Sequence, residues 1–285
     1  GGAEPGERSP TQPYSAFATL KKPNLTEADM WGMSPIDQMV CRIQFREADY
    51  AGYYTPPSEN HSIEYPGYNG GSDWGSIAVD PARGVIVANY NDMPNYVKLV
   101  PRAVAEKKGW QPRGPQGNTG GGKAEGAGDP QSGVPYAVDV NAGWRIPFTG
   151  LLCKQPPYGG ITAIDLMTGQ TIWDRPFGSA RKNGPFGISS HLPVTIGTPN
   201  NGGAVVTAGG LIFVAATTDD LIHAIDLKTG KTLWTAALPG GGQSNVMTYE
   251  EGGRQYVVVM AGGHHFMKTK VSDAVVAYAL PTTST

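Results

Sequence analysis

The chain has few cysteines, few charges and no long apolar run among its 285 residues. Its two cysteines, Cys41 and Cys153, belong to no Cys-x-x-Cys pair and to no His/Cys cluster that would indicate a zinc site. The sequence is compatible with a disulfide between them or with two buried thiols. Charged residues are 16% of the chain and the net charge is −2, so no polyanionic partner is implied. No apolar run reaches the length of about 18 residues that predicts a transmembrane helix, and no signal peptide is recognisable.

Glycine and proline, in contrast, are abundant, with 40 and 24 residues. This composition is typical of a β protein with many turns and loops. The only helical patterns are a short one at residues 26–33 and a second at residues 96–107. We therefore predict an all-β chain with long irregular loops.

An eleven-residue phrase occurs twice, at residues 163–173 and 224–234, with eight identical positions. Each copy predicts a strand, an Asp-x-x-Thr-Gly turn and a second strand that ends in Trp173 or Trp234. The turn needs a positive φ, which Gly169 and Gly230 adopt without steric cost. Repeats of this spacing are typical of propellers, where the tryptophan can pack one blade onto the next. A single duplicated hairpin in a β-sandwich is the alternative.

The residues around the second copy support a propeller blade. Residues 203–208, 210–216, 221–227 and 231–237 predict four short strands. Residues 254–261 and 273–280 predict the start of another blade, and residues 74–79 and 84–90 predict a hairpin. The chain has room for about four blades, the low end for a closed propeller. We therefore expect it to be roughly the C-terminal half of a longer propeller.

The predicted organisation has four parts. Residues 1–70 are an irregular, aromatic-rich segment that we expect to pack on the propeller. Residues 71–103 are a partial blade, residues 104–135 are a Gly/Pro-rich surface insertion, and residues 136–285 are the C-terminal blades.

Several stretches together resemble the C-terminal part of the membrane-bound glucose/quinate/shikimate dehydrogenases, quinoproteins that use pyrroloquinoline quinone (PQQ). The repeated phrase resembles the tryptophan-docking motif of the eight-bladed quinoproteins. The more specific stretches are Ser9-Pro-Thr-Gln-Pro13, Asp29-Met-Trp-Gly32, Asp37-Gln-Met-Val-Cys41-Arg42, Thr55-Pro-Pro-Ser58, Cys153-Lys-Gln-Pro156, Gly242-Gln-Ser-Asn-Val-Met-Thr-Tyr249, Ala261-Gly-Gly-His264 and Val276-Ala-Tyr-Ala-Leu-Pro281.

The resemblance implies oxidation of a secondary alcohol or lactol by hydride transfer to PQQ, with an Asp general base and a calcium ion. In the family these groups precede the segment that Ser9 opens. The resemblance therefore implies that this chain contains no catalytic residue and no metal ligand. It also implies that the chain needs the N-terminal part of the same enzyme as its partner. It further implies electron transfer to ubiquinone and a location on the periplasmic side of the bacterial inner membrane, with an anchor in the missing N-terminal region.

Four positions match residues near the cofactor in the family: Asn89, Asn201, Asp219 and His264. Asn89 could instead cap a strand end, and Asp219 could hold a blade turn. Asn201 lies where related methanol dehydrogenases have a tryptophan. His264 follows two glycines that allow the backbone to approach a ligand. Trp74 is more typical of a packing residue.

The predicted substrate-binding residues are His264, His265, Lys268 and His191. Cationic donors suit a carboxylate, and the doubled histidine resembles the quinate/shikimate type. This favours oxidation of quinate or shikimate to the 3-dehydro acid over oxidation of glucose to gluconolactone, although Lys268 could belong to a solvated loop.

Two other protein classes compete with this interpretation. A non-catalytic propeller scaffold would keep the docking motifs but would not need Asn89 and the Gly-Gly-His stretch. A dehydrogenase with a haem c domain predicts a Cys-x-x-Cys-His motif, which these residues do not contain.

Overall fold

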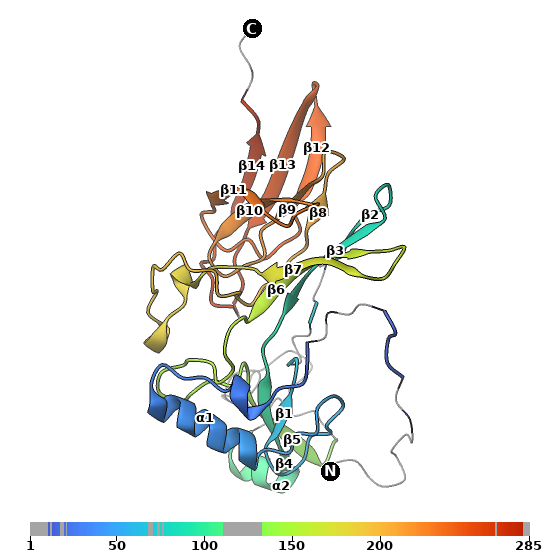
Figure 1. Ribbon diagram of the computed structural model, residues 1–285. Coiled ribbons are helices and arrows are strands. Elements are labelled where there is room, and N and C mark those ends of the chain that lie inside the picture. Colours follow the sequence, from blue (N-terminus) through green and yellow to red (C-terminus); the bar gives the residue numbers. More distant parts are fainter. Residues whose placement is uncertain are drawn as a thin grey trace. The chain divides into compact units, whose positions relative to one another are not determined.

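The computed structural model describes residues 11, 13–17, 20, 22–67, 71–72, 75, 77–110, 133–265 and 267–281 (Figure 1). The chain forms two compact units. Unit 1 comprises Gly1–Tyr14, Lys22–Tyr68 and Met93–Gln155, and unit 2 comprises Ser15–Lys21, Asn69–Asp92 and Pro156–Thr285. Trp74, residues 1–10 and most of the predicted insertion at 104–135 lie outside the described residues.

Unit 2 consists of three antiparallel sheets, which confirms the all-β prediction for this part (Figure 1). The first has the order β2 (Ile77–Asp80), β3 (Val85–Asn91), β6 (Gly159–Asp165) and β7 (Thr171–Pro176). The second runs from β8 (Val205–Val206) through β9 (Leu211–Val214) and β10 (Leu221–Asp226) to β11 (Thr232–Ala237). The third comprises β12 (Met247–Glu251), β13 (Arg254–Ala261) and β14 (Ala274–Ala279). The predicted strands therefore form blade-like sheets of neighbouring strands.

Both copies of the repeated phrase fold as the predicted hairpin. Asp165 Oδ1 accepts the backbone N–H of Thr168 at 2.8 Å, and Asp226 Oδ1 accepts that of Thr229 at 2.7 Å. Gly169 and Gly230 have φ values of 68° and 69°. The turn chemistry of the phrase is thus used in the same way in both sheets.

Trp173 joins the first sheet to the second. Its indole Nε1 donates to the Leu227 carbonyl at 2.8 Å. A Cβ atom on Gly230 would lie 2.7 Å from the indole, so only glycine leaves room for the ring. Trp234 packs at 5.1 Å from Tyr278 of β14 and remains 40% exposed. The docking role predicted for the repeat is therefore confirmed at Trp173.

Unit 1 contains a helix that the sequence reasoning missed. α1 spans Pro35–Glu47, so the prediction of no helix beyond residues 26–33 and 96–107 was wrong. The helix begins where Ser34 Oγ accepts the Asp37 N–H at 3.2 Å, with Pro35 as its first residue. Ser followed by Pro and then an acidic residue is a start signal that was present in the sequence.

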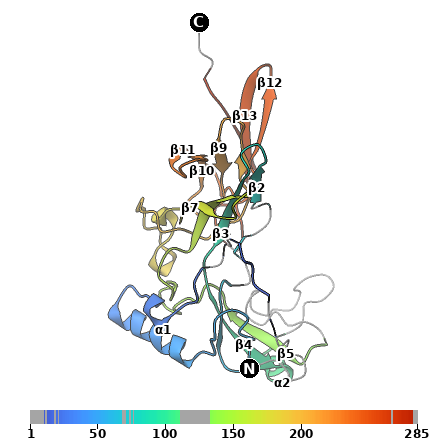
Figure 2. The ribbon, with the colours of Figure 1, turned by 45° about the vertical axis from the view of Figure 1, so that its right-hand side comes forward.

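The remaining elements of unit 1 are a small sheet and short helices. The sheet has the order β1 (Ser62–Glu64), β4 (Asn95–Pro101) and β5 (Tyr136–Asn141). α2 (Arg102–Lys107) follows β4 and lies beside β4 and β5 (Figure 2). The helix predicted at 96–107 is therefore a strand followed by a short helix. Strands β3 and β6, which precede and follow residues 93–155 in the chain, pair with each other in unit 2. Residues 93–155 are therefore inserted between two paired strands.

A disulfide lies in the core of unit 1. Cys41 of α1 and Cys153 are bonded, and both are fully buried. Trp144 is also fully buried in this core, and its Nε1 donates to Gln44 Oε1 at 2.7 Å. The disulfide settles the alternative that the sequence left open. No helix among the described residues is long and apolar enough to cross a membrane.

The strand directions give unit 2 two distinct ends. The tight turns at 81–84, 166–170, 207–210, 227–231 and 252–253 all close one end of their sheets, which we call the turn end. The loops after β7, β9, β11 and β13 leave the opposite end, which we call the loop end.

Candidate functional site

Every residue predicted to bind cofactor or substrate lies at the loop end of unit 2. Asn89 lies near the end of β3, and Asn201 and His191 lie between β7 and β8. Asp219 lies between β9 and β10, and His264, His265 and Lys268 lie between β13 and β14. The topology therefore collects residues from four separate chain segments at one end of the sheets.

Asn89 is fixed in a buried network of asparagines. Its Nδ2 donates to Asn200 Oδ1 at 2.8 Å and to the Gly202 carbonyl at 3.0 Å. Asn91 Oδ1 accepts the Asn200 N–H at 2.8 Å. Asn89 is 1% exposed, and its Oδ1 accepts no hydrogen bond from the described residues. A buried amide oxygen of this kind is an acceptor available to a ligand or a water.

Asp219 is engaged by protein donors on both carboxylate oxygens. Oδ2 accepts the backbone N–H and the hydroxyl of Ser179, each at 2.8 Å, and Oδ1 accepts the Thr217 hydroxyl at 2.6 Å. The carboxylate therefore holds the start of the β7–β8 loop against the β9–β10 loop. This is the structural role that the sequence left open for Asp219, and a cofactor contact remains a prediction.

His264 is connected to Asp219 through a chain of hydrogen bonds. The His264 backbone N–H donates to Thr269 Oγ1 at 2.9 Å, and that hydroxyl donates to Gln243 Oε1 at 2.7 Å. Gln243 Nε2 donates to the carbonyl of Thr217 at 2.8 Å. Thr217 in turn holds Asp219, so one polar network joins two of the predicted positions.

The same network reaches the two predicted asparagines. Asn200 forms a β-bridge with Thr217, and the Asn201 N–H donates to the Ala216 carbonyl at 3.0 Å. Asn200, Gln243 and Thr269 therefore tie the predicted positions together, although the sequence singled out none of them. In the sequence these three residues stand out only as polar residues close to predicted strands. Such residues are too common to indicate a site.

The predicted substrate-binding residues are more exposed. The rings of His264 and His265 stack with centroids 5.2 Å apart, and His265 and Lys268 are exposed. His191 lies on the exposed β7–β8 loop, where its N–H donates to the Arg181 carbonyl at 2.9 Å. The structure thus places His191 on a different loop from His264, and binding roles for all four residues remain predictions.

Asp220 is a further acidic residue at the loop end that the sequence reasoning missed. It is 7% exposed, adopts φ = 57°, and its Oδ2 lies 3.5 Å from Lys182 Nζ. Burial raises the pKa of the Asp220 carboxyl above its ordinary value, while the nearby lysine opposes this effect. The Asp219–Asp220 pair was the available signal, but only the structure distinguishes the engaged carboxylate from its neighbour.

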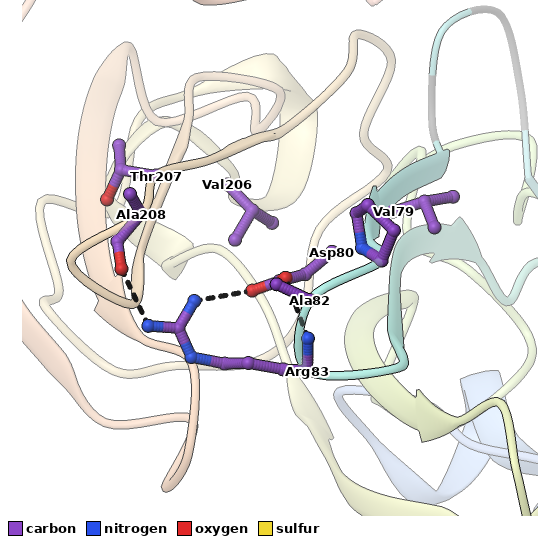
Figure 3. A pocket seen from close by; sticks show the side chains of 8 residues that line it. Val79, Asp80, Ala82, Arg83, Val206, Thr207 and Ala208 are labelled. Atoms are coloured by element: carbon purple, nitrogen blue, oxygen red, sulfur yellow. Dashed lines mark hydrogen bonds and ion pairs between the residues drawn. The ribbon is translucent and has the colours of Figure 1, made fainter.

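A shallow hollow of about 450 Å³ lies at the turn end, between the β2–β3 turn and the residues around β8 (Figure 3). Arg83 crosses it: Nη1 contacts Asp80 Oδ2 and Nη2 donates to the Ala208 carbonyl, each at 2.6 Å. Most of the other lining side chains are apolar. Because its guanidinium already has two acceptors and the predicted residues lie at the opposite end, we do not assign the cofactor site to this hollow.

Comparison with known proteins identifies related sequences. The family profile described as "PQQ: Glucose/ethanol/alcohol dehydrogenase, beta-propeller domain" matches residues 1–257. The glycerol dehydrogenase large subunit of Gluconobacter oxydans is 57% identical over 98% of this chain and 38% of its own length. The quinoprotein glucose dehydrogenase of Escherichia coli is 43% identical over 96% of this chain and 33% of its own length. The quinate/shikimate dehydrogenase (quinone) of Acinetobacter baylyi is 40% identical over 97% of this chain and 34% of its own length.

Two points follow from these similarities. The chain spans only about a third of the length of these relatives. The sequence-based preference for the quinate/shikimate type is unsupported, because the identity to the glycerol dehydrogenase subunit, 57%, exceeds the 40% identity to the quinate/shikimate enzyme. The doubled histidine and one lysine were too few residues to decide between substrates.

Proposed function

Because the chain belongs to the β-propeller family of PQQ-dependent glucose, ethanol and alcohol dehydrogenases, we propose that it is part of a quinoprotein that oxidises glycerol or a related polyol. The observation that carries the choice of substrate is the 57% identity to a glycerol dehydrogenase large subunit over 98% of the chain. Glucose is the second candidate, supported by the 43% identity to a quinoprotein glucose dehydrogenase.

In this proposal, polar groups at the loop end of unit 2 contact a bound PQQ. Asn89 Oδ1 offers a buried acceptor, and the backbone N–H groups of Asn201 and His264 are held by hydrogen bonds of the network described above. When bound, PQQ supplies the quinone carbonyl that accepts a hydride from the alcohol carbon. In this proposal the network fixes Asn89 and His264 so that they hold and orient the cofactor without reorganising.

The general base and the calcium ligands are proposed to come from the remainder of the enzyme. Among the described residues, no group of three or more His, Cys, Asp or Glu side chains gathers where a metal ion could bind. The relatives are about three times as long as this chain, so there is room for these groups outside it. We further propose ubiquinone as electron acceptor, in line with the quinone named for the Acinetobacter baylyi relative, and a location on the periplasmic side of the membrane.

The proposal is tested with the full-length enzyme reconstituted with PQQ and calcium. Reduction of an electron-accepting dye is measured with glycerol, glucose, quinate and shikimate as separate substrates. We expect the highest kcat/KM with glycerol. A highest kcat/KM with glucose would favour the second candidate, and activity with quinate or shikimate alone would overturn both.

A second measurement tests the cofactor contact. His264→Ala should weaken PQQ binding by about ten-fold, the effect of losing one hydrogen bond to a charged group. His61→Ala is the control, because His61 is an exposed histidine of unit 1 that is not among the predicted binding residues. Equal PQQ affinity in wild type and His264→Ala would return His264 to a purely structural role.

A further inference from the structure

Asp220 differs from Asp219 in having an unused carboxylate oxygen. Both side chains are buried, but both oxygens of Asp219 accept hydrogen bonds from the protein. The Oδ1 atom of Asp220 is buried and accepts no hydrogen bond from the described residues. Within the described part of the chain, its Oδ2 atom forms an ion pair with Lys182 Nζ at 3.5 Å. A buried carboxylate oxygen without a donor is costly, so this position favours a ligand that brings one.

The surroundings of Asp220 place this oxygen among the loops of the candidate site. Lys182 belongs to the β7–β8 loop, which carries His191, and Lys270 of the β13–β14 loop, which carries His264, also acts on the Asp220 charge. Asn183 Nδ2 donates to Thr218 Oγ1 at 3.0 Å, so the β7–β8 loop is held close by. Asp220 is therefore flanked by both loops that carry the predicted substrate residues.

The backbone of Asp220 is also unusual. Its φ of 57° lies in the left-handed region, which residues other than glycine adopt infrequently, although aspartate and asparagine do so more often than most. Such conformations persist where surrounding structure enforces them, and they cluster at ligand-binding sites. Here the Asp220 carbonyl accepts the Leu238 N–H at 2.8 Å, which fixes the loop in this conformation.

The chemistry of the free oxygen selects among substrates. A neutral polyol presents several hydroxyl donors, one of which can donate to Asp220 Oδ1 while another carbon is oxidised. The carboxylate of a hydroxy acid offers no donor and would leave Asp220 Oδ1 unpaired. We infer that Asp220 is a specificity-determining residue whose Oδ1 accepts a hydrogen bond from a substrate hydroxyl that is not oxidised, favouring polyols over hydroxy acids. This inference rests on the proposed polyol dehydrogenase activity.

The test compares substrates that differ by one hydroxyl in the full-length enzyme loaded with PQQ and calcium. Glycerol and propane-1,2-diol are oxidised by wild type, Asp220→Gly and Asp220→Asn, and kcat/KM is measured for each. Both replacements tolerate the positive φ, so the loop is expected to keep its shape. We expect Asp220→Gly to reduce the preference for glycerol by about ten- to hundred-fold, mainly through KM. Asp220→Asn retains an uncharged acceptor, so we expect it to reduce the preference for glycerol less than Asp220→Gly does.

Two control variants separate substrate binding from stability. Lys182→Met removes the ion pair but leaves Oδ1, so it should lower the Tm and retain the hydroxyl preference. Glu250→Gln replaces an exposed carboxylate on β12 by an amide, as Asp220→Asn does for a buried one, and should change neither the Tm nor the hydroxyl preference. PQQ affinity should be equal in wild type and both Asp220 variants.

The outcomes distinguish this inference from the proposed function. If wild type oxidises glycerol and both Asp220 variants keep its preference over propane-1,2-diol, the inference is wrong and the proposed function stands. Weaker PQQ binding in both variants would also overturn it, because Asp220 would then act on the cofactor. If wild type oxidises no polyol, the proposed function and the inference fall together.

Discussion

Asn89 Oδ1, Asp220 Oδ1 and His223 Nδ1 are among the buried side-chain atoms of unit 2 that have no hydrogen-bond partner in the described part of the chain. Buried polar groups are nearly always paired, so each of these atoms needs a physical reason. Asn89 and Asp220 lie at the loop end, where a ligand can supply the missing donor. His223 lies inside the second sheet, on β10, and its unpaired nitrogen has a consequence for stability instead.

His223 is predicted to make the protein sensitive to acid. Burial lowers its pKa below the ordinary value of about 6.5, and the charge of Arg175 acts in the same direction, against Asp219. The unfolded chain therefore binds a proton as the pH falls below about 6.5 while the folded protein does not. The contribution of His223 to the free energy of unfolding is therefore fully present above that pH. It decreases below that pH by at most about 1.4 kcal/mol per pH unit.

Replacing His223 by Gln removes this titration. We expect the Tm of wild type to fall more steeply than that of His223→Gln between about pH 6.5 and pH 5. His191→Gln, on an exposed loop, is the matched control and should keep the wild-type slope. Parallel Tm curves for wild type and His223→Gln would show that His223 binds protons equally in both states.

Only some residues of the candidate site could be predicted from the sequence. Asn89, Asp219 and His264 could be selected from the sequence because they match positions of the resembled family, and each lies within or close to a predicted strand. Asn200 could not, since its bond to Asn89 joins residues 111 positions apart. Asp220 was missed for a related reason: which of two adjacent aspartates has an unpaired oxygen depends on Ser179, a residue on another loop.

The hairpins were predictable because their chemistry is local. Asp165 and Gly169 lie four positions apart, so the turn is encoded within one short segment. Helix α1 also has local signals at Ser34, Pro35 and Asp37, but its exposed apolar side chains obscure the expected one-sided pattern; these are Ile36, Met39 and Ile43. The insertion of residues 93–155 between β3 and β6 was unpredictable, because strand pairing across such a distance has no local signal.

The two docking tryptophans should differ in their contribution to stability. Trp173→Phe removes the indole bond to Leu227 and leaves that carbonyl without it, so we expect a loss of about 1–3 kcal/mol in the free energy of unfolding. Trp234→Phe, at the same repeat position, removes a partly exposed ring edge contact with Tyr278 and should cost under about 1 kcal/mol. Urea unfolding of both variants measures the difference, and equal losses would mean that the Leu227 bond contributes little.

The molecule as a whole combines two units with different sources of stability. Unit 2 has extended apolar cores between its sheets, centred on residues such as Ile161, Ile212 and Val259. Unit 1 has one small sheet and a core built around the disulfide and Trp144. Small cores supply little hydrophobic stabilisation, so covalent cross-links matter more in them. The sequence could predict the β character of unit 2 from its repeat, but nothing in it separated unit 1 as a body with its own core.

The disulfide should therefore dominate the stability of unit 1. Cys41 and Cys153 are 112 positions apart, and closing a loop of that size restricts the unfolded chain strongly. We expect Cys41→Ser/Cys153→Ser to lower the unfolding free energy of unit 1 by about 2–5 kcal/mol. Hydrogen exchange measured by mass spectrometry should become faster in α1, β4 and β5. Met39→Ser, at an exposed position of the same helix, is the matched control and should leave exchange unchanged. Unchanged protection in the double variant would mean that the core around Trp144 holds α1 without the covalent bond.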